Sequence, residues 1–261
     1  MKISIITICF NSEKHIEEAI LSVVNQNYKN KEYIIIDGGS TDGTLSIVRK
    51  YKDKIDYFIS EPDKGISDAF NKGIKASTGD VVCICNSDDI MADNVLSEFA
   101  AYYEEDVELY RLDEITRDFE TGEEFKFSPT MYIPKIPFNI HLLHMGCYIK
   151  KAAFEKYGLY DLDFHYCMDL EWMRRAYYRG IKSKHVPLVC GYFRRGGASS
   201  SSEKKMRNER RQIVLRYGGN RLDAVYYVFL EILKKYAKKA LTLFGKNTAI
   251  KIKSKSSIKN Q

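Results

Sequence analysis

Four consecutive residues, Asn86-Ser87-Asp88-Asp89, carry the clearest potential for chemistry in this chain of 261 residues. They follow an apolar run at 81–85, which is typical of a strand buried on both faces. Two adjacent carboxylates at a strand end suit a hard divalent cation such as Mg²⁺ or Mn²⁺, which bridges one or two carboxylates to a substrate's phosphates. Aspartate is also common in turns and at helix starts, so the tetrapeptide alone leaves a structural role equally open.

A second carboxylate, Asp37, ends another buried strand pattern at 33–36 and precedes Gly38-Gly39-Ser40. Glycines let a ligand approach the backbone closely, and an acid at this place can hydrogen-bond a base or a ribose. The alternative is an ordinary glycine-rich turn, in which Asp42 caps the following helix. Asp37 stands too early to cap that helix, which favours a functional role for it.

The elements that position these residues alternate along the first hundred positions. Strands separated by helices of this length predict right-handed crossovers and a parallel sheet. In such sheets, ligands bind beyond the carboxyl ends of the strands. Strand patterns cover 3–9, 33–36, 57–60 and 81–85, and helix patterns cover 12–25, 44–51, 67–76 and 93–103. The polar residues expected at the ligand-binding edge are Asn11, Asp37, Asp68, Asp88 and Asp89.

The second half of the chain is less regular. Its predicted elements are a hairpin of 108–115 and 124–127, a strand at 147–150 leading into a helix, a helix at 167–179 and a last strand at 184–190. The chain after residue 246 is rich in Lys and Ser and is expected to be disordered.

The motifs of the first half resemble, in type and order, those of family 2 glycosyltransferases. Residues 4–11 resemble the family's opening pattern, S-x-I-x-P-x-Y-N, and residues 33–44 are similar to its nucleotide-binding strand and turn. Residues 61–73 resemble a subgroup that makes bacterial surface polysaccharides, including colanic-acid and O-antigen transferases. The cluster at 86–89 then matches that subgroup's form of the acidic metal motif, whereas the resemblance weakens across 105–140.

The resemblance implies an α/β protein with the GT-A fold, in which a Rossmann-like, mostly parallel sheet is flanked by helices. The catalytic domain would span 1–220, with a nucleotide-sugar half at 1–104 and an acceptor half at 105–220. The implied reaction is inverting transfer of glucose, galactose or N-acetylglucosamine from a UDP-sugar, with Mn²⁺ or Mg²⁺ as cofactor. The implied acceptor is a sugar on undecaprenyl diphosphate, in the synthesis of O-antigen, capsule or exopolysaccharide.

The resemblance also assigns roles to individual residues. The residues expected to bind the nucleotide sugar are Thr7, Phe10, Asn11, Asp37, Asp68 and Asp88. Thr7, Phe10 and Asp37 would contact the uracil, and Asp88 would contact the ribose or the donor sugar. Asp89 would bind the metal ion on the pyrophosphate. Asn86 stands where many relatives carry an aspartate, so the metal would have fewer charged ligands.

An inverting transfer needs a carboxylate that takes the proton of the acceptor hydroxyl as that oxygen attacks the sugar. Residues 168–175 resemble the family segment E-D-x-E-L-x-x-R, and alignment on Arg175 puts Asp169 at the base position. Glu171 points roughly 200° around the helix from Asp169, so the two acids cannot share that role. The alternative for Asp169 is a favourable charge at a helix N-terminus.

Four further residues complete the set of candidates. His144 would contact the acceptor or the diphosphate, or be a structural histidine. Glu171 and Trp172 would face the acceptor, although packing in the core is the safer interpretation for the chain's single tryptophan. Arg195, next to Arg194, could fold over the diphosphate, or lie in a solvated basic loop.

Composition limits the class of protein. The six cysteines show no second paired spacing, which predicts buried, reduced thiols and a cytoplasmic location. The N-terminus has no signal-peptide pattern, and no apolar run approaches the ~18 residues of a membrane-spanning helix. The net charge of +6 gives no indication of nucleic-acid binding, because the segment from 221 carries ten Lys/Arg and two acids and the rest sums to about −2.

The segment 221–245 predicts a basic amphipathic helix. Apolar residues recur at helical spacing from Leu222 to Phe244, with Lys234, Lys235, Lys238 and Lys239 between them. Such a helix is typical of peripheral binding to an anionic membrane, here the inner face of the cell membrane where lipid-linked acceptors reside. Docking on the catalytic domain or on a second copy is the alternative.

Three other classes of protein fit less well. A nucleotidyltransferase would need a glycine-rich, basic loop after the first strand, and residues 10–13 are not that. A nicotinamide enzyme would need Gly-x-Gly-x-x-Gly at the same place. A non-catalytic nucleotide-sugar sensor would be expected to lack Asp89 or Asp169, and both acids are present.

Overall fold

The computed structural model describes residues 1–119, 121–129, 144–194 and 203–217, and eight helical positions between 222 and 236. The chain divides into two compact units, one of Met1–Ile133 with Asn139–Glu209 and one of Pro134–Phe138 with Arg210–Gln261. The predicted segment 221–245 falls in the second unit and lies largely outside the described residues, and 246–261 lies wholly outside them.

The first unit is built on a sheet of nine described strands in the order β3-β2-β1-β4-β8-β6-β9-β5, with β7 paired to β6. The strands are β1 (Ile3–Cys9), β2 (Lys31–Asp37), β3 (Tyr57–Ser60), β4 (Val81–Ile84), β5 (Ile90–Met91), β6 (Leu109–Arg117), β7 (Glu124–Phe127), β8 (Cys147–Lys150) and β9 (Ser183–Arg194). The α-helices are α1 (Ile16–Val24), α2 (Thr44–Lys50), α3 (Ile66–Ala76), α4 (Val95–Ala100), α5 (Lys151–Tyr157), α6 (Met168–Tyr178) and α7 (Glu203–Arg216), with short 3-10 helices at Lys52–Lys54 and His144–Gly146.

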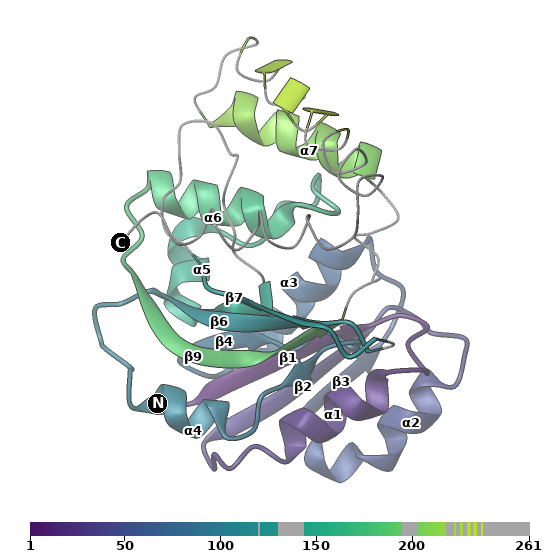
Figure 1. Ribbon diagram of the computed structural model, residues 1–261. Coiled ribbons are helices and arrows are strands. Elements are labelled where there is room, and N and C mark those ends of the chain that lie inside the picture. Colours follow the sequence, from purple (N-terminus) through teal and green to yellow (C-terminus); the bar gives the residue numbers. More distant parts are fainter. Residues whose placement is uncertain are drawn as a thin grey trace. The chain divides into compact units, whose positions relative to one another are not determined.

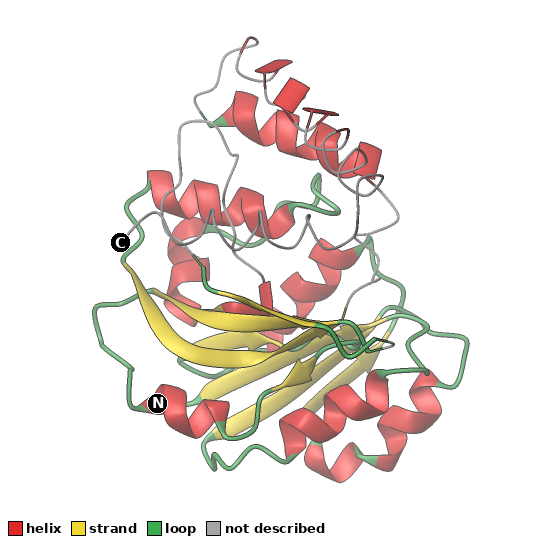
Figure 2. Ribbon diagram, viewed as in Figure 1, coloured by secondary structure: helices red, strands yellow, loops and turns green. Residues whose placement is uncertain are grey.

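Two layers of helices enclose this sheet. Helices α1, α2 and α4 lie on one face, and α3, α5 and α6 lie on the other (Figure 1). Coloured by secondary structure, the strands form one continuous curved layer between them (Figure 2). The predicted α/β architecture is therefore confirmed.

The direction of the strands changes halfway along the sheet. Strands β1 to β4 pair in parallel, as the alternation of strands and helices predicts. Strand β8 then runs antiparallel to both β4 and β6, β6 and β9 are parallel, and β5 is antiparallel to β9. The short β5 has no counterpart among the predicted elements, because two residues show no periodicity.

Strand β1 shows how the two layers form. Its Ile3 and Ile5 pack in one cluster with Ile16 of α1, and each such burial contributes about 1.5–3 kcal/mol. The next residue, Ile6, faces α3, where a Cβ on Gly73 would lie 2.5 Å from its Cγ2 atom. The alternating isoleucines thus bury both faces of β1, as expected of a central parallel strand.

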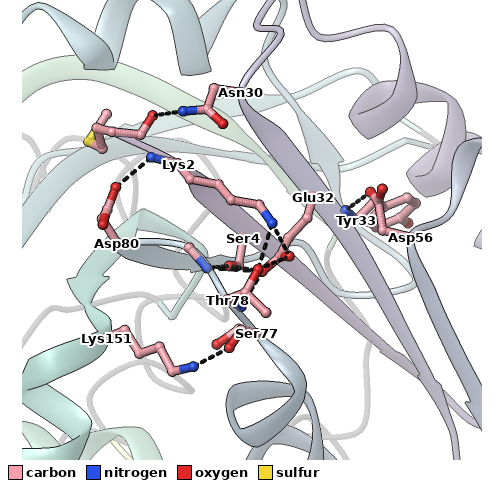
Figure 3. Close-up of polar contacts among 12 residues, drawn as sticks. Lys2, Ser4, Asn30, Glu32, Tyr33, Asp56, Ser77, Thr78, Asp80 and Lys151 are labelled. Carbon is pink, nitrogen blue, oxygen red and sulfur yellow. Dashed lines mark hydrogen bonds and ion pairs between the residues drawn. The ribbon is translucent and has the colours of Figure 1, made fainter.

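At the amino ends of these strands, Glu32 of β2 gathers a set of donors (Figure 3). Its carboxylate accepts hydrogen bonds from Lys2 Nζ at 2.6 Å, Ser4 Oγ at 2.5 Å and Thr78 Oγ1 at 2.6 Å. Burial alone would raise the pKa of Glu32, but these donors outweigh it and lower the pKa to about 2. The cluster ties β1, β2 and the start of β4 together at the edge opposite the candidate site.

Candidate active site

The two acids of the predicted metal motif have different surroundings. Asp89 is fully buried, and its Oδ2 accepts a hydrogen bond from Asn86 Nδ2 at 2.8 Å. Its Oδ1 accepts one from the main-chain N–H of Arg194 at 3.1 Å. Asp88 is half-buried beside it. Of the two carboxylates, that of Asp88 is therefore the more accessible to a ligand.

Burial makes Asp89 unusual for an aspartate. Desolvation, and after it the neighbouring charge of Asp88, raises the pKa of Asp89 to about 7. A cation at this place would relieve both effects. The donor set fits Mg²⁺ or Mn²⁺, because one or two carboxylates plus phosphate oxygens are their usual ligands. The described residues hold no cluster of three or more His, Cys, Asp or Glu that would form a complete protein cage.

Arg194 fastens the end of β9 onto the acidic motif. Besides its main-chain bond to Asp89, its Nε donates to the carbonyl of Asp88 at 3.1 Å. The guanidinium also pairs with Glu18 of α1 at 2.7 Å and lies 3.6 Å from the ring centre of Phe119. Arg194 is thus held in place by four contacts, whereas the predicted diphosphate residue Arg195 lies outside the described residues.

Asp37 organises the glycine-rich turn from within. Its buried carboxylate accepts hydrogen bonds from the N–H groups of Gly39 at 3.0 Å and Ser40 at 2.9 Å, and from the hydroxyl of Ser60 at 2.7 Å. Burial would raise the pKa of Asp37, but these donors lower it. Asp37 does not cap the following helix, but it supports the turn that follows it. Asp42 accepts from the N–H of Thr44 at 3.0 Å, which is the predicted helix-starting role.

Thr7 departs from its predicted place at the uracil. The side chain is fully buried and its hydroxyl donates to the carbonyl of Cys85 at 2.6 Å. The hydroxyl also hydrogen-bonds Tyr33 Oη at 3.0 Å. Because Thr7 lies inside the sheet, it connects β1 to β4 and offers no surface to a base.

Phe10 and Asn11 form the surface beside the glycine-rich turn. The ring of Phe10 is 61% exposed, and a Cβ on Gly38 would lie 3.5 Å from it. Asn11 adopts a left-handed φ of 49°, and its Oδ1 accepts from the N–H of Thr41 at 2.9 Å. This turn delays the start of α1 to Ile16. It also leaves an aromatic face open next to a backbone without side chains, which suits a stacked base.

Asp68 lies in the first turn of α3 and is half-buried. Its carboxylate accepts from the main-chain N–H of Lys64 at 3.0 Å and lies 3.7 Å from Lys72 Nζ. It therefore stabilises the start of its own helix while remaining partly accessible.

Asp169 occupies the first turn of α6 and is half-buried. Its charge acts on a buried thiol. Burial raises the pKa of Cys147 most, and the charges of Asp169 and then Glu114 raise this pKa further. Burial and then Asp89 raise the pKa of Glu114 to about 9. Asp169 thus acts on the Cys147 thiol, whereas Asp89 acts on Glu114.

Two of the three proposed acceptor residues, Trp172 and Glu171, are internal. Trp172 is fully buried, donates its indole N–H to the carbonyl of Gly158 at 2.6 Å and packs on Phe154, so the core interpretation holds and an acceptor contact does not. Glu171 is buried and pairs with Arg175 at 2.9 Å, which also removes it from the acceptor.

His144 hydrogen-bonds Tyr160 Oη through Nε2 at 2.6 Å and packs edge-on against Phe70. Burial lowers the pKa of His144 to about 3, so the ring is neutral at physiological pH. These contacts match the structural alternative for His144.

Two residues near the acidic motif were not among the candidates. Phe119 follows β6 and carries the guanidinium of Arg194 on its ring. Glu114 is buried on β6, and its carboxylate oxygens have no hydrogen-bond donor among the described residues. Its spacing from Leu112 in an alternating strand signals an inward-facing acid, which sequence reasoning could have noticed.

Comparison with known proteins identifies the family to which this chain is similar. The model of glycosyl transferase family 2 matches residues 4–176. An uncharacterized glycosyltransferase of Haemophilus influenzae is 36% identical over 99 residues, which span 37% of this chain and 40% of that protein. An uncharacterized glycosyltransferase of Mycobacterium tuberculosis is 29% identical over 189 residues, or 67% of this chain and 68% of that protein.

Solved structures agree with the fold. The crystal structure of Staphylococcus aureus TarS superposes with a TM-score of 0.66 at 22% identity, over 82% of this chain and 39% of that one. The mannosyltransferase PcManGT of Pyrobaculum calidifontis, in complex with GDP-Man and Mn²⁺, gives a TM-score of 0.60 at 18% identity, over 83% of this chain and 62% of that one. With the family model covering well over half of its length, this chain belongs to glycosyl transferase family 2 and has the GT-A fold.

Proposed function

We propose that this chain is an inverting, metal-dependent hexosyltransferase that uses a UDP-sugar. The observation that carries the proposal is the pair of half-buried carboxylates, Asp88 after β4 and Asp169 at the start of α6. One carboxylate would serve the donor's diphosphate and the other the acceptor's hydroxyl. S. aureus TarS, a structural neighbour, was crystallised with UDP and with UDP-GlcNAc, which favours a uridine donor here.

The donor would lie along the carboxyl edge of β1, β2 and β4. Phe10 would stack on the uracil, because its ring is exposed beside the bare backbone of Gly38. Asp37 would act by holding the turn in shape, with its carboxylate occupied by the turn's own donors. Asn11 would fix the position of the neighbouring turn through Thr41.

Mn²⁺ or Mg²⁺ would be held at the acidic motif between protein and diphosphate, where it would stabilise negative charge on the departing UDP. Asp89 is the predicted ligand, but the half-buried Asp88 offers the more accessible carboxylate. We therefore propose that Asp88 faces the ion and that Asp89, held by Asn86 and Arg194, orients the motif.

Asp169 would accept the proton of the acceptor hydroxyl while that oxygen attacks the anomeric carbon from the side opposite UDP. The new C–O bond then forms as the bond to the UDP oxygen breaks, which inverts the configuration. Asp169 lies in the first turn of α6, and a helix N-terminus favours a negative group.

The acceptor is proposed to be a lipid-linked sugar, such as one on undecaprenyl diphosphate, in the synthesis of O-antigen, capsule or exopolysaccharide at the inner face of the cell membrane. The cholesterol galactosyltransferase of Borreliella burgdorferi, 36% identical over 97 residues, is a relative whose name includes a lipid acceptor. The described apolar residues of the second unit support membrane contact, with exposed fractions from 37% to 77% at Leu222, Val225, Tyr226, Phe229, Ile232, Leu233 and Tyr236.

Membrane contact would be peripheral in this proposal. Within the described part of the chain, no helix has the length and apolar character needed to cross a bilayer. The test is flotation with vesicles that contain anionic lipid, comparing the full chain with a truncation after Asn220. We expect the full chain to float and the truncation to stay at the bottom; equal flotation of both would contradict a role for the C-terminal segment.

The reaction itself is tested by incubating the protein with UDP-glucose, UDP-galactose and UDP-N-acetylglucosamine in separate assays, with Mn²⁺ and with EDTA. Slow release of UDP to water from one of them, lost in EDTA, is the expected result. UDP release that is unaffected by EDTA would refute the metal, and the absence of both release and UDP binding would refute the transferase.

A further inference from the structure

The start of α6 is capped by an acid from a distant helix. The carboxylate of Glu209 in α7 accepts hydrogen bonds from three consecutive main-chain N–H groups, those of His165 at 3.0 Å, Tyr166 at 2.9 Å and Cys167 at 2.8 Å. The side chain of Glu209 is 7% exposed. A buried carboxylate with three charge-assisted hydrogen bonds holds its partners strongly, because each such bond is stronger than a neutral one.

The contact lies immediately before α6, which has no side-chain cap of its own. Cys167 is the residue that precedes the helix, and its side chain makes no capping hydrogen bond to the first turn. Ser, Thr, Asn or Asp normally supplies that bond. Glu209 instead places a negative charge just before the helix, and the thiol of Cys167 lies 3.7 Å from the carbonyl of Met206 in the same distant helix. A negative charge at this end is also favoured by the helix dipole.

The loop that Glu209 holds is fixed from its other side by α3. Ser67 Oγ donates to the carbonyl of Phe164 at 2.5 Å. The amide of Asn71 bonds Tyr160 twice, donating to its carbonyl at 2.8 Å and accepting from its N–H at 2.9 Å. The segment before α6 is therefore held by α3 on one side and by Glu209 on the other. Removing Glu209 would release only the end next to α6.

We propose that Glu209 is a positioning residue for the candidate base. Asp169 lies two residues after Cys167, so the direction of its carboxylate depends on the path of the backbone that Glu209 holds. The proposal rests on the proposed function of Asp169. Loss of this support would shift the carboxylate of Asp169 away from its productive position. A displacement of about 1 Å is enough to lower the rate roughly 10²-fold.

The test compares Glu209→Ala and Glu209→Gln with Asn208→Ala, an exposed neighbour on the same helix, and with Asp169→Asn. Two properties are measured in the presence of Mn²⁺: the rate of UDP release to water from the best UDP-sugar, and UDP affinity by calorimetry. We expect Glu209→Ala to lose about 10²-fold in kcat with UDP affinity within twofold of wild type. Glu209→Gln keeps one acceptor oxygen, so its kcat should lie between those of Glu209→Ala and wild type. The kcat of Asn208→Ala should match that of wild type.

Hydrogen exchange gives the second readout. In Glu209→Ala, the amides of residues 165–167 should exchange faster, while those of α3 keep their protection. If Glu209→Ala does not fold, the same comparison is made on Glu209→Gln. Wild-type kcat in a Glu209 variant whose amides 165–167 are deprotected would overturn the positioning role, and so would unchanged exchange at those amides. Retained turnover in Asp169→Asn would instead show that the proposed base is wrong, which separates the two failures.

Discussion

The main-chain N–H of Arg194 lies 3.1 Å from Oδ1 of Asp89, although 105 residues separate the two in the chain. This bond joins the end of β9 to the acidic motif after β4. It means that the second half of the sheet helps to build the proposed donor site of the first half. The side chain of Arg194 reinforces the connection through Asp88, Glu18 and Phe119.

Arg194→Ala should therefore weaken the donor site without unfolding the protein. The main-chain bond to Asp89 remains possible, but the contacts of the guanidinium are lost. We expect UDP affinity in Mn²⁺ to fall roughly tenfold, equivalent to about 1.4 kcal/mol, as measured by calorimetry. Lys50→Ala, which breaks the exposed pair with Glu17, is the matched control and should bind UDP like wild type. Equal affinity in both variants would mean that Arg194 has no part in the site.

Phe10→Ala tests the stacking surface. Removal of an exposed ring next to Gly38 should cost UDP binding about 1–3 kcal/mol, the range found for stacking of a base on an aromatic side chain. Thermal stability should change little, because the ring is mostly in solvent. Phe58→Ala, at another exposed aromatic on β3, serves as control. A Phe10→Ala protein that binds UDP as tightly as the Phe58→Ala control would remove Phe10 from the uracil site.

Trp172 offers a spectroscopic check of its placement in the core. As the single tryptophan and a fully buried one, it should emit at short wavelength and resist quenching by acrylamide. Trp172→Ala should destabilise the protein by about 3–5 kcal/mol in urea unfolding, whereas Trp172→Phe should retain most of the stability. Strong quenching by acrylamide in the folded protein would contradict this placement.

Glu32 gives the pH dependence of stability. Its pKa lies at about 2 in the folded protein and at the ordinary 4.5 in the unfolded chain. The stabilisation is complete above pH 4.5 and is lost as the pH falls from 4.5 toward 2, because the unfolded state then binds the proton first. Glu32→Gln should unfold at lower urea than wild type at pH 7, and the gap should narrow at pH 3.

The control for this effect is Glu105→Gln, since Glu105 is almost fully exposed and its pair with Lys150 should contribute little. A constant gap between wild type and Glu32→Gln from pH 7 to pH 3 would show that the charge of Glu32 does not provide the stabilisation.

The first half of the fold could be predicted from the sequence because its signals are local. Strands such as β1 are continuous apolar runs, and their alternation with helices determines a parallel arrangement. The antiparallel insertion of β8 between β4 and β6 could not be predicted, since pairing of distant strands leaves no local signal. The strand β5 could not be predicted either, because its two residues show no periodicity.

The candidate site, too, could be predicted from the sequence only in part. The acids at strand ends could be identified because the carboxyl edge of a parallel sheet is a geometric consequence of its topology. The sequence does not show which candidate side chains already have partners inside the protein, because those partners lie far away in the chain. Thr7 is enclosed by Tyr33 and Cys85, and Glu171 by Arg175. The contact of Glu209 with the start of α6 likewise joins segments more than 40 residues apart.

The central claim is transfer with Asp169 as base, and Asp169→Asn tests it most directly. The substitution keeps the size of the side chain and removes only its ability to take a proton. UDP release from the best UDP-sugar in Mn²⁺ and UDP affinity should be measured on the same preparation. The account predicts that release falls by at least about 10²-fold while UDP affinity stays within twofold of wild type. Release at the wild-type rate would contradict it.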